Sequence, residues 1–271
     1  MIKDVLVIVV THNSARHIDW CVSGLSGAEN VEIRIIDSGS TDVSYLAKYE
    51  RGSNHSVFYA TNLGFVGGNA QALFSLDKFR YVLFLNPDAR IDAEELGRLL
   101  RFADANPNFG VYTVPLIKFD IAKMRAEEKY DSLGIFCSRL GRWYDRRVMK
   151  RSDAGKTFYH IDAACGALTL VSQEALLRCL DSQGKVGFES TFHMYKEDIE
   201  YSLRAKSFGY QPVIFLCSYA FHCRGWTNRG GVADWAKRES AKNDVFIAKK
   251  YRKRNLPFAL LKKALVSTGI F

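Results

Sequence analysis

The sequence predicts an α/β protein whose central sheet is mostly parallel and covered by helices on both faces. Short apolar runs alternate with helical stretches through the first half of the chain, which is typical of parallel sheets. Each run leads into a polar turn rich in Gly, Asn, Ser or Asp. Within the runs polar and apolar residues do not alternate, as expected for strands buried on both faces.

Four strands are expected in the first ninety residues. They are residues 5–10, 31–36, 57–60 and 81–85. The helices that follow them should end near residues 25, 50, 78 and 105, and Asp92 to Glu95 has the pattern of a capping box for the last one. Because the carboxyl ends of parallel strands share one edge of a sheet, the four polar turns should line a single crevice.

This rhythm ends in the second half of the chain. Residues 119–159 are rich in Arg, Lys, Asp and Tyr and show little periodicity, which predicts an excursion or flexible region over the site. Ser172 is a plausible helix cap after a further strand. The remaining expected elements are strands at 167–171 and 213–216, helices at 173–180, 196–208 and 235–251, and loops at 187–195 and 221–226.

Composition places the chain among ordinary globular proteins. It has 271 residues, of which 48% are hydrophobic and 25% are charged. No apolar run approaches the roughly 20 residues of a membrane-spanning helix, and no small-residue cleavage site follows the start. Six scattered cysteines without a Cys-x-x-Cys pair favour reduced thiols and a cytoplasmic location. Cys217, His222 and Cys223 lack the fourth ligand of a usual zinc site.

A formal charge of +9 favours an anionic partner, either nucleic acid, a nucleotide-activated substrate or an acidic membrane surface. Basic residues at 249–254 and 262–263 flank an apolar stretch at 256–261. A helix that lies on an anionic bilayer needs this arrangement. A solvated terminal helix explains the same pattern equally well.

The most informative motif is Asn86-Pro87-Asp88, which ends the fourth strand. Pro87 cannot continue the ladder, so Asp88 stands just past the carboxyl end of the strand, where open α/β sheets bind ligands. A carboxylate there suits a divalent cation that carries a substrate phosphate. One carboxylate is too little for a metal, and His222 from a distant loop is a candidate for completing the shell.

Three further segments contain candidate ligand-binding or catalytic residues. Asp37, at the end of the second strand, suits hydrogen bonds from a base or ribose, although its turn also simply starts a helix. The Gly-rich loop at 62–69 opens a helix and offers N–H groups to phosphate, but it matches neither the dinucleotide nor the Walker pattern. Glu197-Asp198 follows an aromatic loop, so a general base is one interpretation and ordinary acids of a first helical turn are another.

Taken in order, these motifs resemble the inverting family 2 glycosyltransferases of the GT-A (Rossmann-like) fold, in particular their bacterial rhamnosyltransferase and galactofuranosyltransferase-like branch. The resemblance covers roughly residues 3 to 250. Its motifs are Thr11-His12-Asn13-Ser14, the turn at 37–42, the loop at 62–69, Asn86-Pro87-Asp88, Cys165-Gly166-Ala167, Glu197-Asp198 and His222.

The resemblance implies a role for each matching residue. Asp198 would deprotonate the acceptor hydroxyl, and Asp88 and His222 would hold Mg²⁺ or Mn²⁺. Asn86 replaces the first acid of the usual Asp-x-Asp motif, so it adds no charge to that site. The implied donor-binding residues are Thr11, Asn13, Asp37, Gly64, Asn69, Asn86, Asp88, Gly166 and Ala167. A GT-A domain would span 1–235, with a nucleotide-binding half at about 1–115, an acceptor-binding half at about 116–235, and a basic helical segment at 236–271.

We therefore expect a metal-dependent inverting glycosyltransferase that moves rhamnose from dTDP-rhamnose to a saccharide acceptor, expected in a lipid-linked form, during bacterial O-antigen or capsule synthesis. A UDP-sugar donor, such as UDP-galactofuranose or a UDP-hexose, is the alternative within this fold. A nucleotidyltransferase would need a basic Gly-rich loop near the first strand, which residues 11–14 do not provide. A nucleic-acid-binding protein would gather basic and aromatic residues on one face, whereas the charge here concentrates near the C-terminal end, so no nucleic acid partner is expected. The expected location is cytoplasmic, with peripheral attachment to the inner face of the plasma membrane.

Overall fold

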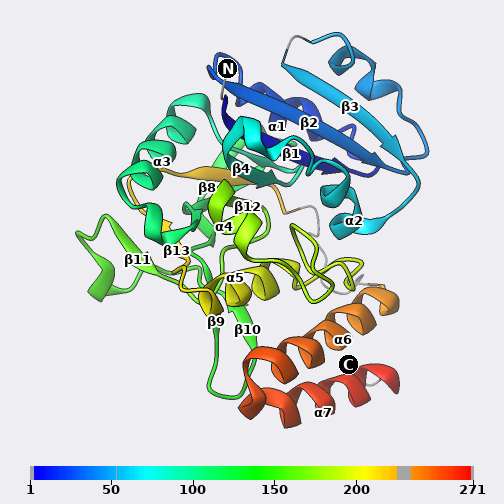
Figure 1. Cartoon of the computed structure of the whole chain (residues 1–271), viewed down its shortest axis with the longest axis vertical. Coiled ribbons are helices and arrows are strands. Elements are labelled where there is room, and N and C mark those ends of the chain that lie inside the picture. Colours follow the sequence, from blue (N-terminus) through cyan, green and yellow to red (C-terminus); the bar gives the residue numbers. More distant parts are fainter. Residues whose placement is uncertain (1–2, 53, 225–232, 270–271) are drawn as a thin grey trace.

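The computed structural model describes residues 3–52, 54–224 and 233–269. Within these ranges the largest sheet has eight strands in the order β11-β13-β6-β12-β4-β1-β2-β3 (Figure 1). Its strands are β1 Lys3–Thr11, β2 Val31–Ser38, β3 His55–Ala60, β4 Phe79–Leu85, β6 Val111–Thr113, β11 Phe158–His160, β12 Leu168–Ser172 and β13 Val213–Phe215.

The four strands nearest the N-terminus are parallel neighbours, which confirms the predicted α/β class. β1 lies between β2 and β4, and β3 pairs with β2 at the sheet edge. Residues 5–9 and 82–84 are fully buried, as the continuous apolar runs predicted. β12 pairs antiparallel with both β4 and β6. The sheet is therefore mostly parallel around β1 and mixed beyond β4.

Helices cover this sheet and extend beyond it. They are α1 Ile18–Ser23, α2 Gly64–Gln71, α3 Ala93–Ala105, α4 Gln173–Arg178, α5 Glu197–Ser207, α6 Asp234–Tyr251 and α7 Leu256–Ser267. The first predicted helices are shorter than expected: residues 44–49 and 76–78 form 3-10 turns rather than α-helix. In Figure 1, α6 and α7 lie side by side at the end of the molecule away from β3.

The stretch at 119–159, predicted to be an excursion or a flexible region over the site, largely leaves the main sheet but forms regular strands of its own. A second sheet has the order β5-β14-β7-β8, and β9 and β10, which follow β8 in sequence, form a two-stranded hairpin. These strands are β5 Ala89–Arg90, β7 Leu116–Asp120, β8 Arg125–Ser132, β9 Ile135–Cys137, β10 Trp143–Asp145 and β14 Ala220–His222. Most of β8 is exposed or half-buried and charged, so no apolar periodicity marks it, and tertiary pairing with β7 decides its conformation.

Two local predictions also change. His222 is not in a loop: it ends β14 and pairs with Ala89 of β5. Asp92 does not form a capping box, because its carboxylate accepts a hydrogen bond from Arg90 at 2.8 Å. The acid three residues later, Glu95, instead accepts from the backbone N–H of Tyr219 at 3.2 Å.

Other local predictions are confirmed. The Ser172 hydroxyl caps α4 by accepting from the Ala175 N–H at 3.2 Å. All six cysteines are free thiols. Across the described ranges, no helix combines the length and apolar character needed to cross a bilayer.

Candidate active site

A cleft of about 750 Å³ opens at the carboxyl edge of the parallel strands. The turns after β1, β3 and β4 and the last residue of β2, Ser38, contribute to its lining, so the four strand ends share one edge as predicted. The end of β14, the loop before α5 and the start of α6 complete it. Its residues are Val10, Thr11, His12, Asn13, Ser14, His17, Ser38, Asn62, Gly64, Phe65, Asn86, Pro87, Asp88, His193, Met194, Tyr195, His222, Arg224 and Trp235.

Asp88 and His222 meet in this cleft although 134 positions of the chain separate them. The His222 Nε2 atom lies 3.4 Å from the Asp88 Oδ1 atom. The backbone brings them together, because the Cys223 N–H donates to the Asp88 carbonyl at 2.8 Å next to the pairing of β5 with β14. The sequence predicted both residues, and the second sheet supplies their proximity.

Asp131 on β8 orients the imidazole. Its Oδ2 atom lies 2.8 Å from His222 Nδ1, so the other ring nitrogen is directed at Asp88. A carboxylate behind a histidine commonly fixes the orientation of a metal-ligating ring. Burial disfavours the charged form of His222, but the carboxylates of Asp88 and Asp131 outweigh burial and raise its pKa to about 9.

Arg224 extends this network into the cleft. Its guanidinium contacts Asp131 Oδ1 at 3.0 Å and Asp145 Oδ2 at 2.5 Å, and its backbone is left-handed with φ of 45°. Sequence reasoning missed Asp131, Asp145 and Arg224. The two acids lie in the stretch that showed no periodicity, and only the closeness of Arg224 to His222 was a signal.

The donor set fits a divalent cation that is shared with a substrate. Among the described residues, no group of three or more His, Cys, Asp or Glu side chains is arranged to hold a metal. Asp88 and His222 supply two converging donors, and substrate phosphate oxygens and water commonly fill the remaining positions. Metal binding requires the neutral imidazole, so an ion would displace the proton that the Asp88 contact stabilises.

Asn86 contributes hydrogen-bonding groups rather than charge. Its N–H donates to the carbonyl of Ala167, the residue before β12, at 3.0 Å. Its side-chain oxygen is buried and has no hydrogen-bond partner within the described part of the chain. A buried acceptor without a partner costs free energy unless a ligand or water supplies a donor.

Two of the predicted donor-binding residues, Thr11 and Asn13, line the cleft, and a third, Asp37, does not. The Asp37 carboxylate is buried and accepts from the N–H groups of Gly39 at 3.1 Å and Ser40 at 2.9 Å. It therefore shapes the turn after β2.

The start of α2 brings Gly64 into the cleft but leaves Asn69 behind it. Gly64 has φ of 70°, and a Cβ there would lie 2.5 Å from the His193 ring. The glycine therefore allows His193 to pack on the first turn of α2. Asn69 is buried and donates to the Phe65 carbonyl at 2.8 Å inside the helix, and the residues that line the cleft do not include it.

The residues at the start of α5 form a separate constellation. Asp198 accepts hydrogen bonds from the Gly166 N–H at 2.9 Å and from the Ile199 N–H at 2.8 Å. A Cβ on Gly166 would come within 3.2 Å of the Asp198 carboxylate. Neither of these residues, nor Ala167, belongs to the cleft lining. Two cleft residues are connected to them. Asn86 donates its N–H to the Ala167 carbonyl, and Tyr195 stands three residues before Asp198 in the sequence.

Glu197 is a buried acid that sequence reasoning did not separate from its neighbour. Its Oε2 atom is buried and has no hydrogen-bond partner in the described ranges. Burial and the adjacent Asp198 carboxylate raise the pKa of Glu197 to about 8, and burial also raises the pKa of Asp198. Two adjacent acids with raised pKa values at the start of one helix are an arrangement suited to proton transfer near neutral pH.

The model of glycosyl transferase family 2 matches residues 6–180. The match includes more than half of the chain, so the protein belongs to this family. Among curated proteins, none matches the chain in sequence.

Solved structures show the same fold. The structure of GalNAc-T7 with UDP, GalNAc and Mn²⁺ superposes with a TM-score of 0.73 at 15% identity, covering 97% of this chain and 52% of that one. S. aureus TarS 1–349 with UDP-GlcNAc gives 0.58 at 18% identity, covering 96% and 72%. The mannosyltransferase PcManGT from Pyrobaculum calidifontis with GDP-Man and Mn²⁺ gives 0.57 at 17% identity, covering 99% and 75%. The chain thus has the GT-A fold and spans about half of the GalNAc-T7 chain.

The raised pKa of Glu197 predicts a pH-dependent stability. The folded protein holds a proton on this carboxyl up to about pH 8, whereas the unfolded chain releases it near pH 4.5. The free energy of unfolding should therefore fall between about pH 5 and pH 8. Urea denaturation should show a smaller fall for Glu197→Gln. The exposed Glu94→Gln should behave like the unmodified protein, and an unchanged slope in Glu197→Gln would contradict the assignment.

Proposed function

We propose that this protein is an inverting, metal-dependent glycosyltransferase that moves a sugar from a nucleotide diphosphate donor to a saccharide acceptor. The observation that carries the proposal is the convergence of Asp88 and His222, 3.4 Å apart, inside the cleft at the carboxyl end of β4. This pair suits a cation that binds diphosphate oxygens. GalNAc-T7 and PcManGT, which share the fold, have structures with Mn²⁺ and a nucleotide or nucleotide sugar.

Asp88 and His222 would hold Mg²⁺ or Mn²⁺, which would supply positive charge against the negative charge that grows on the leaving diphosphate. Arg224 would place a further cation at the same cleft, because its guanidinium lines the cleft while Asp131 and Asp145 hold it. The side-chain oxygen of Asn86, which has no hydrogen-bond partner among the described residues, would accept a hydrogen bond from a hydroxyl group of the nucleotide-sugar donor.

Asp198 would act as the general base for the acceptor hydroxyl. Its carboxylate is held by two backbone N–H groups, and its raised pKa brings proton uptake closer to working pH. Attack by the activated hydroxyl on the face of the sugar away from the diphosphate would invert the anomeric configuration.

For the donor we propose dTDP-rhamnose, and for the pathway the synthesis of a bacterial surface glycan such as O-antigen or capsule. Both rest on the order of motifs from Thr11-His12-Asn13-Ser14 to His222, which resembles the rhamnosyltransferase branch. A UDP-sugar is the second candidate, since TarS and GalNAc-T7 have structures with UDP-GlcNAc and with UDP.

A panel of nucleotide diphosphates will identify the donor base. The melting temperature should rise most with dTDP in the presence of Mg²⁺ or Mn²⁺, because a ligand at 100 times its Kd stabilises the folded state by about 2.7 kcal/mol. The metal-dependent part of the rise should shrink in His222→Ala. His160→Ala, which changes an exposed histidine outside the cleft, is the control. A larger rise with UDP would select the second candidate, and equal shifts with and without metal would contradict the cation site.

Removal of the base should separate binding from transfer. Asp198→Asn should bind the donor normally and lose transfer by about 10²–10⁴-fold, the usual contribution of a general base. Glu197→Gln is the matched comparison one residue away. Near-normal turnover in Asp198→Asn, with loss in Glu197→Gln, would move the base to Glu197.

We also propose that α7 holds the protein on an anionic membrane, where a lipid-linked acceptor would be found. Its Ala259 and Val266 pack inward, whereas Leu260 and Leu261 are 47% and 58% exposed. Residues 249–263 include seven Lys or Arg and no Asp or Glu. An exposed apolar face beside basic side chains is the composition of an interfacial helix.

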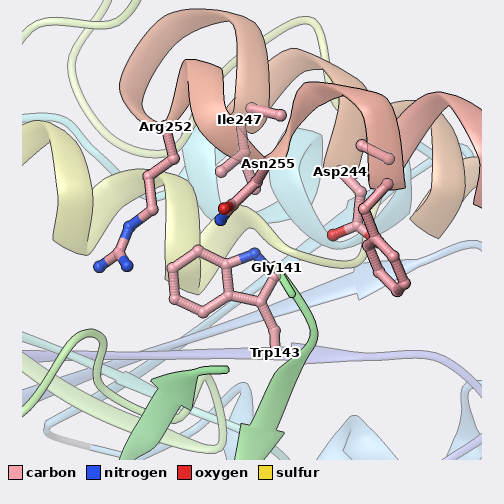
Figure 2. Close-up of a pocket in the computed structure, with 9 residues that line it drawn as sticks. Gly141, Trp143, Asp244, Ile247, Arg252 and Asn255 are labelled. Carbon is pink, nitrogen blue, oxygen red and sulfur yellow. The ribbon is translucent and has the colours of Figure 1, made fainter. Parts of the chain in front are cut away.

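Residues of the β9–β10 hairpin contact the segment that joins α6 to α7 (Figure 2). The Trp143 ring lies 5.0 Å from the Arg252 guanidinium carbon, and Arg252 also pairs with Asp162 at 2.5 Å. The Asn255 amide lies 3.4 Å from Cys137 Sγ. These contacts hold the segment that leads into α7, the helix on which Leu260 and Leu261 are exposed.

Vesicle co-sedimentation tests this attachment. The protein should bind vesicles that contain phosphatidylglycerol and bind phosphatidylcholine vesicles weakly, because each basic residue near an anionic surface contributes about 1 kcal/mol. The double variant Leu260→Ser with Leu261→Ser should bind less. Leu140→Ser, which alters a 75% exposed residue outside α7, should bind normally. Equal binding by all three proteins would remove α7 from the attachment.

A further inference from the structure

Three aromatic side chains, His193, Tyr195 and Trp235, form a wall of the cleft that no part of the proposed donor chemistry uses. The ring centroids of Tyr195 and Trp235 lie 6.1 Å apart at 43°, and those of His193 and Trp235 lie 6.4 Å apart at 73°. Trp235 is 49% exposed. We call these three residues the aromatic wall. Large exposed aromatic side chains at the mouth of a cleft are typical of ligand contact surfaces.

Helix α6 fixes the wall in place. It carries Trp235 in its first turn, and its buried Asn243 donates from Nδ2 to the carbonyls of Met194 at 3.1 Å and Tyr195 at 2.8 Å. Tyr195 and Lys196 both have φ of 70°. Two consecutive non-glycine residues in the left-handed region persist only where their surroundings hold them. The position of the wall is therefore set by packing against α6.

A second hollow of about 500 Å³ meets the cleft at His193 and at the first turn of α2. It runs between α2, the loop at 185–193 and α6, and we call it the side groove. Its lining is mixed. Ser190, Thr191, Glu239 and Lys242 supply hydroxyl and charged groups, Gly67 and Ala70 are small residues of α2, and the larger apolar residues are Leu63, Val66, Val186, Phe188 and Phe192.

We propose that the aromatic wall and the side groove together bind the saccharide acceptor, with one sugar ring against Trp235 and Tyr195 and the following sugars in the groove. A pyranose has an apolar face of C–H groups, which suits the negative face of an aromatic ring, and a rim of hydroxyl groups, which suits the polar lining of the groove. Tyr195 stands three residues before Asp198, so a sugar held on it lies beside the helix start that carries the proposed base. This assignment rests on the proposed function, because it names the second substrate of that site.

Saturation-transfer NMR tests the wall without any turnover. The probes are the methyl glycosides of rhamnose, galactose, glucose and N-acetylglucosamine, each added with Mg²⁺ and either dTDP or UDP. At least one glycoside should receive saturation at its ring C–H protons. Trp235→Ala should raise its Kd about tenfold, or ~1.4 kcal/mol, and Trp235→Phe should restore most of the binding. Melting temperatures without ligand will show that both variants are folded.

Steric filling tests the groove. A disaccharide that contains the bound methyl glycoside at its end should bind more tightly than the monosaccharide. Ala70 is exposed on α2, so Ala70→Trp should fill the groove and remove this gain while the monosaccharide binds as before. Ala70→Ser is the matched control and should keep the gain. A disaccharide gain that survives Ala70→Trp would overturn the groove assignment.

Two results would overturn the wall. One is the absence of saturation transfer to any of the glycosides with the unmodified protein. The other is a loss of nucleotide binding rather than glycoside binding in Trp235→Ala, which would make the wall a stacking surface for the base. Failure of the proposed function is separate: it would show as no response to any nucleotide diphosphate while the glycosides still bind at Trp235.

Discussion

The joint between the two sheets at Asn86, Pro87 and Asp88 is the constraint on which the site depends. The N–H of Asn86 donates to the carbonyl of Ala167, just before β12 of the main sheet, and the carbonyl of Asp88 accepts from Cys223 just after β14 of the second sheet. Pro87 stops β4 between these bonds. The chain therefore cannot shift at this turn without breaking a hydrogen bond next to one sheet or the other. A carboxylate held so firmly retains its direction when a charged ligand arrives, which is what preorganised electrostatic stabilisation requires.

Electrostatics at this joint follow from the same architecture. Asp131 is almost wholly buried, and it avoids the cost of an isolated buried charge by contacting both His222 and Arg224. In turn, Asp131 and Asp88 keep the imidazole charged when no metal competes for it. Asp145 holds Arg224 from the hairpin side. Two sheets and a hairpin thus contribute one cluster of three carboxylates, one guanidinium and one imidazole beside the cleft.

The parallel core was predictable because each strand carries its own signal. The run from Tyr81 to Leu85 is apolar throughout and ends at a proline, so its burial and its end are both local properties. The position of the four strand ends at one edge of the sheet followed from the parallel order of these strands. The second sheet was not predictable, since β8 is charged and half-exposed and takes its shape from β7. The role of Asp131 was not predictable for the same reason. The sequence also does not show that the Asp37 carboxylate accepts hydrogen bonds from the backbone N–H groups of its own turn.

The sequence alone determined the fold class, the turn that presents Asp88, the candidate base and the distant histidine, because strand patterns, proline and helix-start acids act through near neighbours. Only the tertiary structure decided which of these residues meet. It put His222 on a strand beside Asp88, placed Asp131 behind it, set Asn69 inside α2, and brought Trp235 to Tyr195 across some 40 positions of the chain. The physical reason is that these contacts come from pairing and packing between segments far apart in sequence, whose free energy no local pattern records.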